Sequence, residues 1–354
     1  MEYRRLGRTG LRVGAIGLGT EYLQEESRST VVAVVQEAIA QGVNYIDALF
    51  APANYRDNLG AALQGRRDRV IIAGHLGAAE TNGQYRLTRD PQESEKYFLD
   101  LLTRLRIDYV DILFLTNCDD DEDYRRLTAP GGGLEMARRY QKEGKARFIG
   151  FSGHRVATSR LAVESGAIDV LMHPVNLSQA GDAARNELFH LCAQSQVGLV
   201  AMKPFAGGEL LQARAPNPAT PVQCLAYTLS RIGVSTAVPG VKSVAELRAA
   251  LAYFGAPTAA RDFQPLLAGP RAVDMGTCVY CNHCLPCPAG IDIGQTTRLL
   301  VTARYSLTAD LRDAYRALPA LASECIECGE CNERCPFDVD AVTNMQEAAH
   351  VFEA

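Results

Sequence analysis

The stretch CVYCNHCLPCP at residues 278–288, followed by CIECGECNERCP at 325–336, decides how this chain is organised. Each segment places three cysteines two residues apart and ends with a Cys-Pro pair. A short loop with this spacing wraps three thiolates around three corners of an iron–sulfur cube, and it cannot easily supply the fourth corner itself. The two segments therefore predict a small C-terminal domain built around iron–sulfur clusters.

The fourth ligand of each cluster is expected to come from the other segment, as it does in proteins with two such clusters. The expected ligands of one [4Fe–4S] cluster are Cys278, Cys281, Cys284 and Cys335, and those of the second are Cys325, Cys328, Cys331 and Cys287. This exchange would tie the small domain together. A structural zinc module is the alternative, although zinc ribbons use pairs of C-x-x-C. Disulfides would require an oxidising compartment.

The composition indicates a soluble, cytoplasmic protein of more than one domain. The 354 residues carry a net charge of −5 and are 47% hydrophobic, so no basic excess suggests binding to nucleic acid or to an anionic membrane. No stretch reaches the roughly 20 apolar residues of a membrane span, and the start MEYRRLGRTG lacks the apolar core of a signal peptide.

Strand-like apolar runs alternate with helical patterns over the first 254 residues. The expected strands lie at 13–19, 43–49, 69–74, 109–115, 146–152, 168–174, 197–204 and 235–240. Eight strand–helix units with short connections predict a (β/α)8 TIM barrel at 1–254. An open doubly wound sheet is the alternative, but no G-x-G-x-x-G follows the first strand. A linker at 255–275 and a ferredoxin-like iron–sulfur domain at 276–354, with a helical spacer and tail, complete the chain.

Active sites of TIM barrels gather at the carboxyl ends of the strands, which gives a short set of polar candidates. They are Asp47, His75, Thr116, Asn117, Cys118, Ser152, His154, His173, Asn176, Lys203, Gly240, Lys242 and Ser243. His173 is expected to be a packed strand-end histidine, and the acidic run at 119–123 a solvated loop. His283, between two cysteines, is a candidate hydrogen-bond partner of a cluster sulfur.

Several longer motifs carry a resemblance to a known family. They are YRRLGRTGLRVGAIGLG (3–19), NYIDA (44–48), GKARFIGFSGH (144–154), VGLVAMKPFAGG (197–208) and STAVPGVKSVAEL (235–247). On these motifs the chain resembles the aldo/keto reductases over nearly its whole length. The resemblance is to the branch that carries a C-terminal two-cluster ferredoxin-type domain.

The resemblance implies an Asp, Tyr, Lys and His catalytic tetrad, from which this sequence departs. Asp47 matches the aspartate. Pro52 stands at the tyrosine position, His75 at the lysine position and Thr116 at the histidine position. Tyr55 lies shortly after Pro52 and is the remaining candidate proton donor. The expected catalytic residues are therefore Asp47, His75 and Tyr55.

The resemblance also implies positions that hold a nicotinamide nucleotide. They are Ser152, Asn176, Lys203, Gly240, Lys242 and Ser243, with His154 as a further ligand contact. The glutamine that usually holds the carboxamide is replaced by Met172, and the Glu-Asn pair near the adenine by Ala249 and Ala250. NADP(H) is therefore an alternative cofactor rather than the expected one.

The sequence thus predicts an iron–sulfur oxidoreductase, in which a barrel binds a small organic substrate and two clusters carry electrons. A ferredoxin or flavodoxin is the expected electron donor. One alternative is an NAD(P)H-dependent carbonyl reductase with a modified tetrad. Another is a non-redox lyase or isomerase that uses acid/base residues of the barrel. An electron-transfer protein with an inactive barrel is the last.

Overall fold

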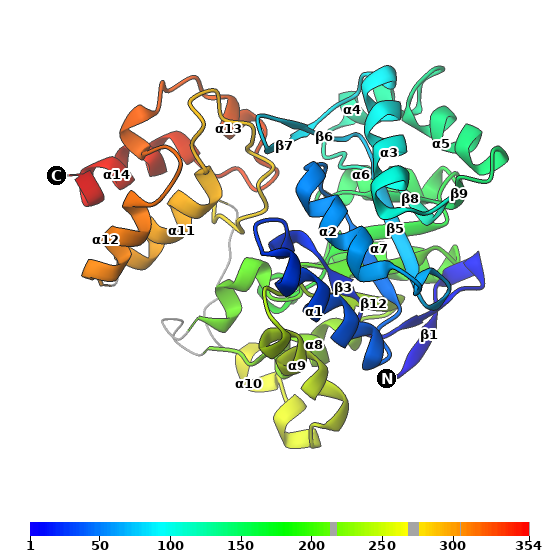
Figure 1. The fold of residues 1–354 in the computed structure, drawn as a ribbon. Helices are drawn as coiled ribbons and strands as arrows, with labels where there is room; N and C mark the ends of the chain where they lie inside the picture. Colours follow the sequence, from blue (N-terminus) through cyan, green and yellow to red (C-terminus); the bar gives the residue numbers. More distant parts are fainter. Residues whose placement is uncertain (213–217, 268–275, 305, 354) are drawn as a thin grey trace.

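Eight parallel strands form a single curved sheet in the first part of the chain (Figure 1). The computed structural model describes residues 1–212, 218–267, 276–304 and 306–353. In order around the sheet, the strands are β3 (Leu18–Gly19), β4 (Tyr45–Ala48), β5 (Ile71–Leu76), β8 (Val110–Leu115), β9 (Ala146–Ser152), β10 (Val170–Pro174), β11 (Gly198–Met202) and β12 (Val234–Val238). Each lies within or overlaps one of the eight expected strands, so the prediction of a barrel is confirmed.

Hydrogen bonds between the first and last strands bring the sheet close to a closed barrel. Parallel bridges join Ile16 to Ala237 and Gly19 to Gly240. A β-carbon on Gly19 would lie only 3.0 Å from the carbonyl oxygen of Val238, so a larger residue would hold these two strands apart. The barrel interior between them is filled by side chains such as Tyr45 and Phe114, which are fully buried.

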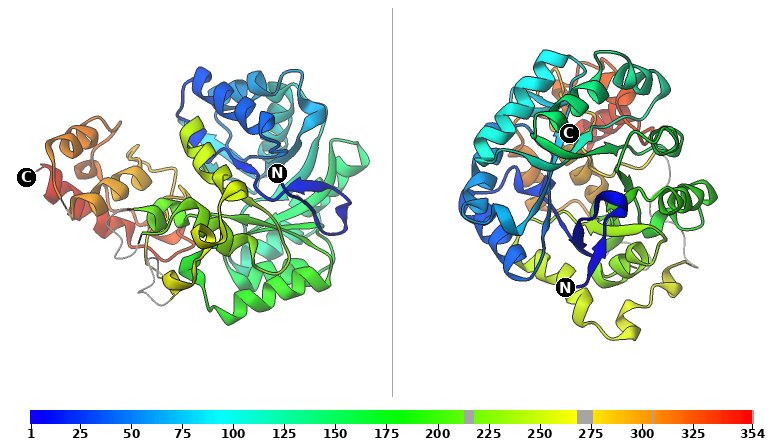
Figure 2. Two further views of the ribbon diagram at one scale, coloured as in Figure 1. Left: turned by 90° about the horizontal axis from the view of Figure 1, so that it is seen from below. Right: turned by 90° about the vertical axis from the view of Figure 1, so that its right-hand side faces the viewer.

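Helices surround the barrel and alternate with its strands (Figures 1 and 2). They are α1 (Arg28–Ala40), α2 (Ala53–Leu63), α3 (Pro91–Leu105), α4 (Asp121–Thr128), α5 (Gly133–Lys142), α6 (Val156–Glu164), α7 (Ala183–Gln194), α8 (Pro221–Leu229) and α9 (Val244–Leu251). Helix α3 shows how the sequence starts them: Asp90 accepts a hydrogen bond from the backbone of Glu93, and Pro91 occupies the first turn. None of the helices in the described residues is long and apolar enough to cross a membrane.

Two antiparallel hairpins that the sequence did not predict flank the barrel. The pair β1 (Tyr3–Arg5) and β2 (Arg12–Gly14) packs Leu6 and Val13 against the barrel interior and closes one end. The pair β6 (Ala78–Thr81) and β7 (Gln84–Leu87) follows β5 and extends towards the small domain (Figure 1).

Part of the expected linker packs on the barrel as short helical turns. These are a 3-10 turn at Thr258–Arg261 and α10 (Gln264–Leu267). The ring of Phe263 lies edge-on to Tyr227 of α8, with 5.4 Å between ring centres. The rest of the expected linker, residues 268–275, lies outside the described residues. Other 3-10 turns are Gly7–Thr9, Glu21–Leu23, Arg67–Arg69, Leu177–Gln179, Ala206–Leu211, Ala252–Gly255 and Ala322–Glu324.

The small C-terminal domain is helical and lies at the end of the barrel opposite the β1–β2 hairpin (Figures 1 and 2). Its helices are α11 (Ile293–Ala303), α12 (Ala309–Arg316), α13 (Glu330–Glu333) and α14 (Ala341–Glu353). Helices α11 and α12 fall in the predicted helical spacer, and α14 in the predicted tail helix. Their core includes Leu300, Tyr315, Met345 and Phe352. The clustered cysteines lie on the loops between the helices, except Cys331, which lies on α13.

Candidate functional site

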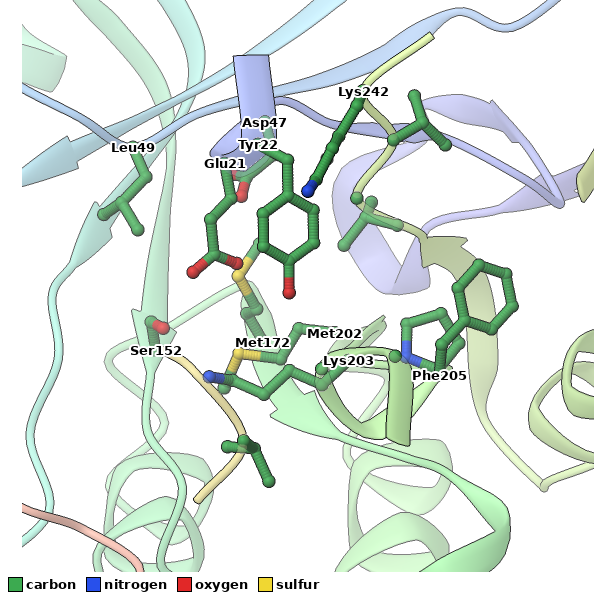
Figure 3. Close-up of a pocket in the computed structure, with 18 of the residues that line it drawn as sticks. Glu21, Tyr22, Asp47, Leu49, Ser152, Met172, Met202, Lys203, Phe205 and Lys242 are labelled. Atoms are coloured by element: carbon green, nitrogen blue, oxygen red, sulfur yellow. The ribbon is translucent and has the colours of Figure 1, made fainter. Parts of the chain in front are cut away.

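A cavity of about 300 Å³ lies where the carboxyl ends of the barrel strands meet the small domain (Figure 3). This volume is at the lower end of the range for small-molecule sites. Most of its wall comes from residues that end barrel strands, including Asp47, His75 and Ser152. The small domain also contributes to the wall, through Val279, His283 and Arg298. A bound molecule would therefore touch both domains.

Asp47 and His75 form a hydrogen-bonded pair in this cavity. Nε2 of His75 lies 2.7 Å from Oδ1 of Asp47, and Nδ1 lies 2.5 Å from the hydroxyl of Thr116. The ring also stacks on Phe114, with centres 5.2 Å apart. The His75 side chain is 1% exposed and that of Asp47 13%. Both residues line the cavity, and Asp47 is the more exposed member of the pair.

Tyr55, the third expected catalytic residue, lies behind the cavity wall. It is fully buried on α2, and its hydroxyl contacts that of Thr20, which also bonds the backbone carbonyl of Asp47. Burial raises the pKa of Tyr55 above its usual value. The cavity is lined by other side chains, so the structure places Tyr55 as a support for the loop after β3.

His154 makes a second imidazole–carboxylate pair, with Asp119. Its Nδ1 lies 2.8 Å from Oδ2 of Asp119, and Nε2 is buried with no hydrogen-bond partner in the described residues. Burial lowers the pKa of His154, although Asp119 opposes that shift. Burial alone would raise the pKa of Asp119, but the charge and hydrogen bonds of His154 hold it well below its usual range. The expectation of a solvated loop is wrong for Asp119, because this carboxylate is engaged inside the protein.

Glu21 and Tyr22 also line the cavity, and the sequence reasoning missed them (Figure 3). Burial raises the pKa of Glu21 to about 7, with Lys203 acting in the opposite direction. Both residues stand just after β3, the first barrel strand, where the strand-end rule would have found them. Lys203 reaches across the cavity towards Ser152 (Figure 3).

The eight clustered cysteines lie around two small cavities in the C-terminal domain. One is lined by Cys278, Cys281, Cys284 and Cys335, and the other by Cys287, Cys325, Cys328 and Cys331. These are the two expected sets, with the fourth cysteine of each drawn from the other segment. Among the described residues no three acidic, histidine or cysteine side chains are grouped to hold a single metal ion.

The two cysteine loops share a backbone conformation. Tyr280 and Asn282 have positive φ values of 52° and 60°, and the corresponding Glu327 and Gly329 have 52° and 79°. Left-handed residues at matching positions let each loop turn its cysteines inward. The backbone N–H of Tyr280 points at the sulfur of Cys278 from 3.4 Å, as expected for a ligand thiolate.

Comparison with known proteins is consistent with both halves of this structure. The Aldo/keto reductase family profile matches residues 11–223, which is more than half of the chain. The chain belongs to the aldo/keto reductase family. The 4Fe-4S dicluster domain profile matches residues 277–340 of this aldo/keto reductase, which is therefore an oxidoreductase with an iron–sulfur domain.

Similar proteins match the barrel of this aldo/keto reductase. The uncharacterized oxidoreductase YqkF of Bacillus subtilis is 25% identical over 70% of this chain and 89% of its own length. The L-galactose dehydrogenase of Arabidopsis thaliana is 26% identical over 70% of this chain and 86% of its own. Among solved structures, the aldo-keto reductase AKR11C1 from Bacillus halodurans (holo form) has a TM-score of 0.63 at 22% identity. The match covers 76% of this chain and 97% of that one.

The positions expected to hold a nucleotide divide into two groups in this aldo/keto reductase. Ser152, His154, Lys203, Gly240 and Lys242 line the cavity. The other two expected residues bond the backbone. The side chain of Asn176 donates to the carbonyl of Lys203 at 3.0 Å, and that of Ser243 caps α9. Because Lys203 has a φ of +55°, Asn176 supports a strained backbone at the cavity wall.

Other polar candidates also have structural partners. His173 is fully buried between Ser159 and Arg185, whose side chains lie 3.1 and 2.6 Å from its ring nitrogens. The buried Cys118 lies beside the backbone carbonyl of Asp120, and burial raises the pKa of its thiol. Met172 and Ala249, which replace nucleotide-binding residues, line the cavity with apolar groups.

The small domain is fastened to the barrel around the cavity. Gln84 of β7 accepts a hydrogen bond from the backbone of Cys287 at 2.9 Å and donates to the carbonyls of Gly290 and Ile291. Further bonds join Tyr280 to Glu209 at 2.7 Å and Arg155 to Asp338 at 2.8 Å. Arg298 lies over the rings of Tyr280 and Tyr22, at 4.3 and 5.8 Å from their centres.

Proposed function

We propose that this aldo/keto reductase family member is an iron–sulfur oxidoreductase that exchanges electrons between two [4Fe–4S] clusters and a small organic substrate in its barrel. One observation supports the proposal most directly. Val279 and His283 belong to the first cysteine loop, and they line the same cavity as Asp47 and His75. A substrate held in this cavity would lie against the loop that holds a cluster.

The chemistry of the cysteine sets fits such clusters. Their cavities are lined largely by apolar side chains, including Val279, Phe337 and Val339 around the first set. Burial raises the pKa of Cys278 to about 12, so its thiolate would be unfavourable there without a cation to balance it. Cysteines at this spacing, exchanging their fourth ligand, would hold two [4Fe–4S] clusters that supply one-electron transfer.

The chain's own residues would handle protons. A carboxylate only accepts hydrogen bonds, so Nε2 of His75 carries the proton that it shares with Asp47. Nδ1 then accepts from the hydroxyl of Thr116, which fixes the ring. In this arrangement Asp47 is the group of the pair that is more exposed to a ligand, and the hydrogen bond from His75 fixes its orientation.

The main alternative is NADP(H)-dependent carbonyl reduction with a modified tetrad. It is supported by the extension of the cavity to Gly240 and Lys242, on the side where the resemblance implies a nucleotide. It is weakened by Met172 and Ala249, which offer that nucleotide no polar group. A non-redox lyase or isomerase would use the same acid/base residues without a reductant.

Electrons would enter at the second cysteine set. Cys328 is exposed, and Ile326 beside it is 65% exposed, the most exposed of the large hydrophobic side chains in the described residues. An apolar contact next to an accessible redox group suits a small protein carrier. We propose a one-electron donor of the ferredoxin or flavodoxin kind.

An anaerobic reoxidation experiment tests the proposal. The cluster-loaded protein is reduced with dithionite, freed of excess reductant and mixed with small carbonyl, hydroxy and unsaturated compounds. We expect at least one compound to restore the visible absorption of the oxidised clusters. NADPH added to the oxidised protein should leave the absorption unchanged. Rapid bleaching by NADPH would favour the alternative.

Cavity variants keep this test specific. Asp47→Asn, which retains the shape of the side chain but not its charge, should slow reoxidation by the active compound about 10²–10⁴-fold. Asp57→Asn changes a half-exposed carboxylate of α2 and should have no effect. If the clusters of both variants were reoxidised at the parental rate, the barrel would have no part in the reaction.

A further inference from the structure

Within the part of the chain that the structure describes, the Asp119–His154 pair has a ring nitrogen without a hydrogen-bond partner, which a proton-transfer site requires, whereas the Asp47–His75 pair has none. Both ring nitrogens of His75 are occupied, one by Asp47 and the other by Thr116. In His154 only Nδ1 is occupied, by Asp119, and Nε2 is buried with no partner among the described residues. His154 is 3% exposed and lines the cavity. A buried polar atom without a partner at a ligand cavity calls for an occupant that bonds it.

The carboxylate of Asp119 fixes the ring of His154. Oδ2 lies 2.8 Å from Nδ1 of His154 and accepts from the side chain of Asn117 at 3.1 Å. Oδ1 accepts from the backbone N–H groups of His154 and Arg155, at 2.5 and 3.2 Å. Four donors hold this carboxylate in its ionised form. Because an ionised carboxylate only accepts, the ring proton lies on Nδ1, and Nε2 presents a lone pair.

We propose that His154 is a catalytic acid–base residue, whose Nε2 takes the proton of a substrate hydroxyl and, in the reverse direction, returns it to the alkoxide oxygen. Asp119 is its positioning residue. The step moves one proton and no electron: the O–H bond breaks, its electron pair stays on oxygen, and an N–H bond forms on the ring. The imidazolium that results is stabilised by the adjacent carboxylate.

A second cleft beside the Asp119–His154 pair offers a route by which the proton could reach solvent. Asp119 lines a second cleft, of about 750 Å³, on the other side of the wall formed by His154, His283 and Asn117. His283 and Asn117 line both spaces. The Asp119 side chain is 15% exposed and that of His154 2%. The pair therefore lies between the barrel cavity, which the imidazole lines, and the second cleft, which the carboxylate lines.

This arrangement narrows the substrate class. The group that meets Nε2 has to be a hydrogen-bond donor in one oxidation state and an acceptor in the other, as an alcohol and its carbonyl are. The first cysteine loop lies close by, since the ring of His283 is 4.6 Å from that of His154, centre to centre, and Phe337 is 5.4 Å away. We therefore expect a small hydroxy or carbonyl compound. This choice rests on the proposed function, whereas the placement of the base does not.

Nitrogen NMR of the cluster-loaded protein with labelled histidine tests the placement of the base directly. The chain has six histidines, and the signals of His154 are those lost in His154→Gln. At neutral pH we expect Nδ1 of His154 to be protonated and Nε2 to be bare. Asp119→Asn should weaken this preference and raise the fraction protonated at Nε2. Protonation of Nε2 in the parent protein would overturn the proposal.

Turnover with the compound that reoxidises the clusters gives the second readout. His154→Gln should lower kcat about 10²–10⁴-fold. The visible absorption per chain should stay at the parental level, which shows that the clusters and the fold are intact. His190→Gln, on the surface of α7, is the matched control and should leave kcat unchanged. Parental turnover in His154→Gln would overturn the proposal and leave the proposed function standing. If no compound reoxidises the parent, the proposed function fails, and the NMR result alone decides the placement of the base.

Discussion

Single side chains in the cavity wall should make the protein sensitive to pH. Burial raises the pKa of Glu21 from 4.5 to about 7 in the folded protein. The native state therefore keeps a proton that the unfolded chain releases. The associated stability is fully present below about pH 4.5 and is lost as the pH rises through about 7. Glu21→Gln cannot ionise. The unfolding free energy of this variant, relative to that of the parent, should therefore rise by up to about 3 kcal/mol between about pH 5 and about pH 8.

Anaerobic urea unfolding of the cluster-loaded parent and variant, at about pH 5 and at about pH 8, measures this difference in unfolding free energy. Glu187→Gln, an exposed glutamate on α7, is the control and should show no such gain. An equal pH dependence in Glu21→Gln and the parent would mean that Glu21 is ionised throughout.

The sequence predicted cavity residues correctly where the residue stands at the carboxyl end of a barrel strand. Asp47 and His75 were chosen as neighbouring strand ends, and the structure places them 2.7 Å apart. The prediction failed where the side chain binds a residue far away in the sequence and its own neighbours suggest a different environment. Asp119 stands in the run DDDED, which looks solvated, and its partner His154 is 35 residues away. Tyr55 was predicted to be a proton donor in the cavity, but it is buried behind the cavity wall because α2 packs against α1 and α3.

At the scale of elements, one close approach controls how the first cysteine loop meets the barrel. A β-carbon on Gly207 would lie 2.3 Å from the carbonyl oxygen of Val279. This oxygen belongs to the backbone, so it cannot move away unless the loop moves with it. Gly207→Ala should therefore push the loop away from the cavity. Gly208→Ala is a matched control, because Gly208 also has a positive φ but a β-carbon there meets nothing within 4 Å.

Hydrogen exchange of the loaded protein checks this prediction. Amides of residues 278–288 should exchange faster in Gly207→Ala than in Gly208→Ala, and reoxidation by the active compound should slow only in the former. The same exchange in both variants would show that backbone strain, rather than the contact with Val279, explains the effect.

The elements that were predictable are those with strong internal patterns. A barrel strand such as β8 is buried at every position, so it reads as an apolar run that only Asp111 interrupts. The hairpin β6–β7 was missed because its two strands have only four residues each and mix exposed with buried positions. It nevertheless carries Gln84, which holds the backbone of Cys287 and Gly290. Short strands that pack against another domain are too short, and too mixed in polarity, to be predicted from the sequence.

At the scale of the whole molecule, the placement of the small domain could not be read from the sequence. Cysteine spacing describes the contacts within that domain, whereas its position depends on single contacts such as Arg298 with Tyr22 and Gln84 with Ile291. The structure shows the domain over the barrel mouth (Figure 1). Val279 and His283 of the first cysteine loop line the cavity, and Cys328 of the second, outer set is exposed. In the function proposed above, electrons would pass from an external carrier at the outer set to the cavity beside the first set.

The outer set should therefore be where a protein donor docks. Ile326→Asp places a charge in the 65% exposed apolar contact beside Cys328 and should slow reduction by a ferredoxin or flavodoxin at least about tenfold. Reduction by dithionite, which needs no docking, should be unchanged. Ile232→Asp alters a 46% exposed isoleucine after α8 on the barrel and serves as the control. Stopped-flow absorption of the clusters measures both rates. If the two variants accepted electrons from the protein donor equally fast, the donor would dock elsewhere, and the inward direction of electron flow would lose its support.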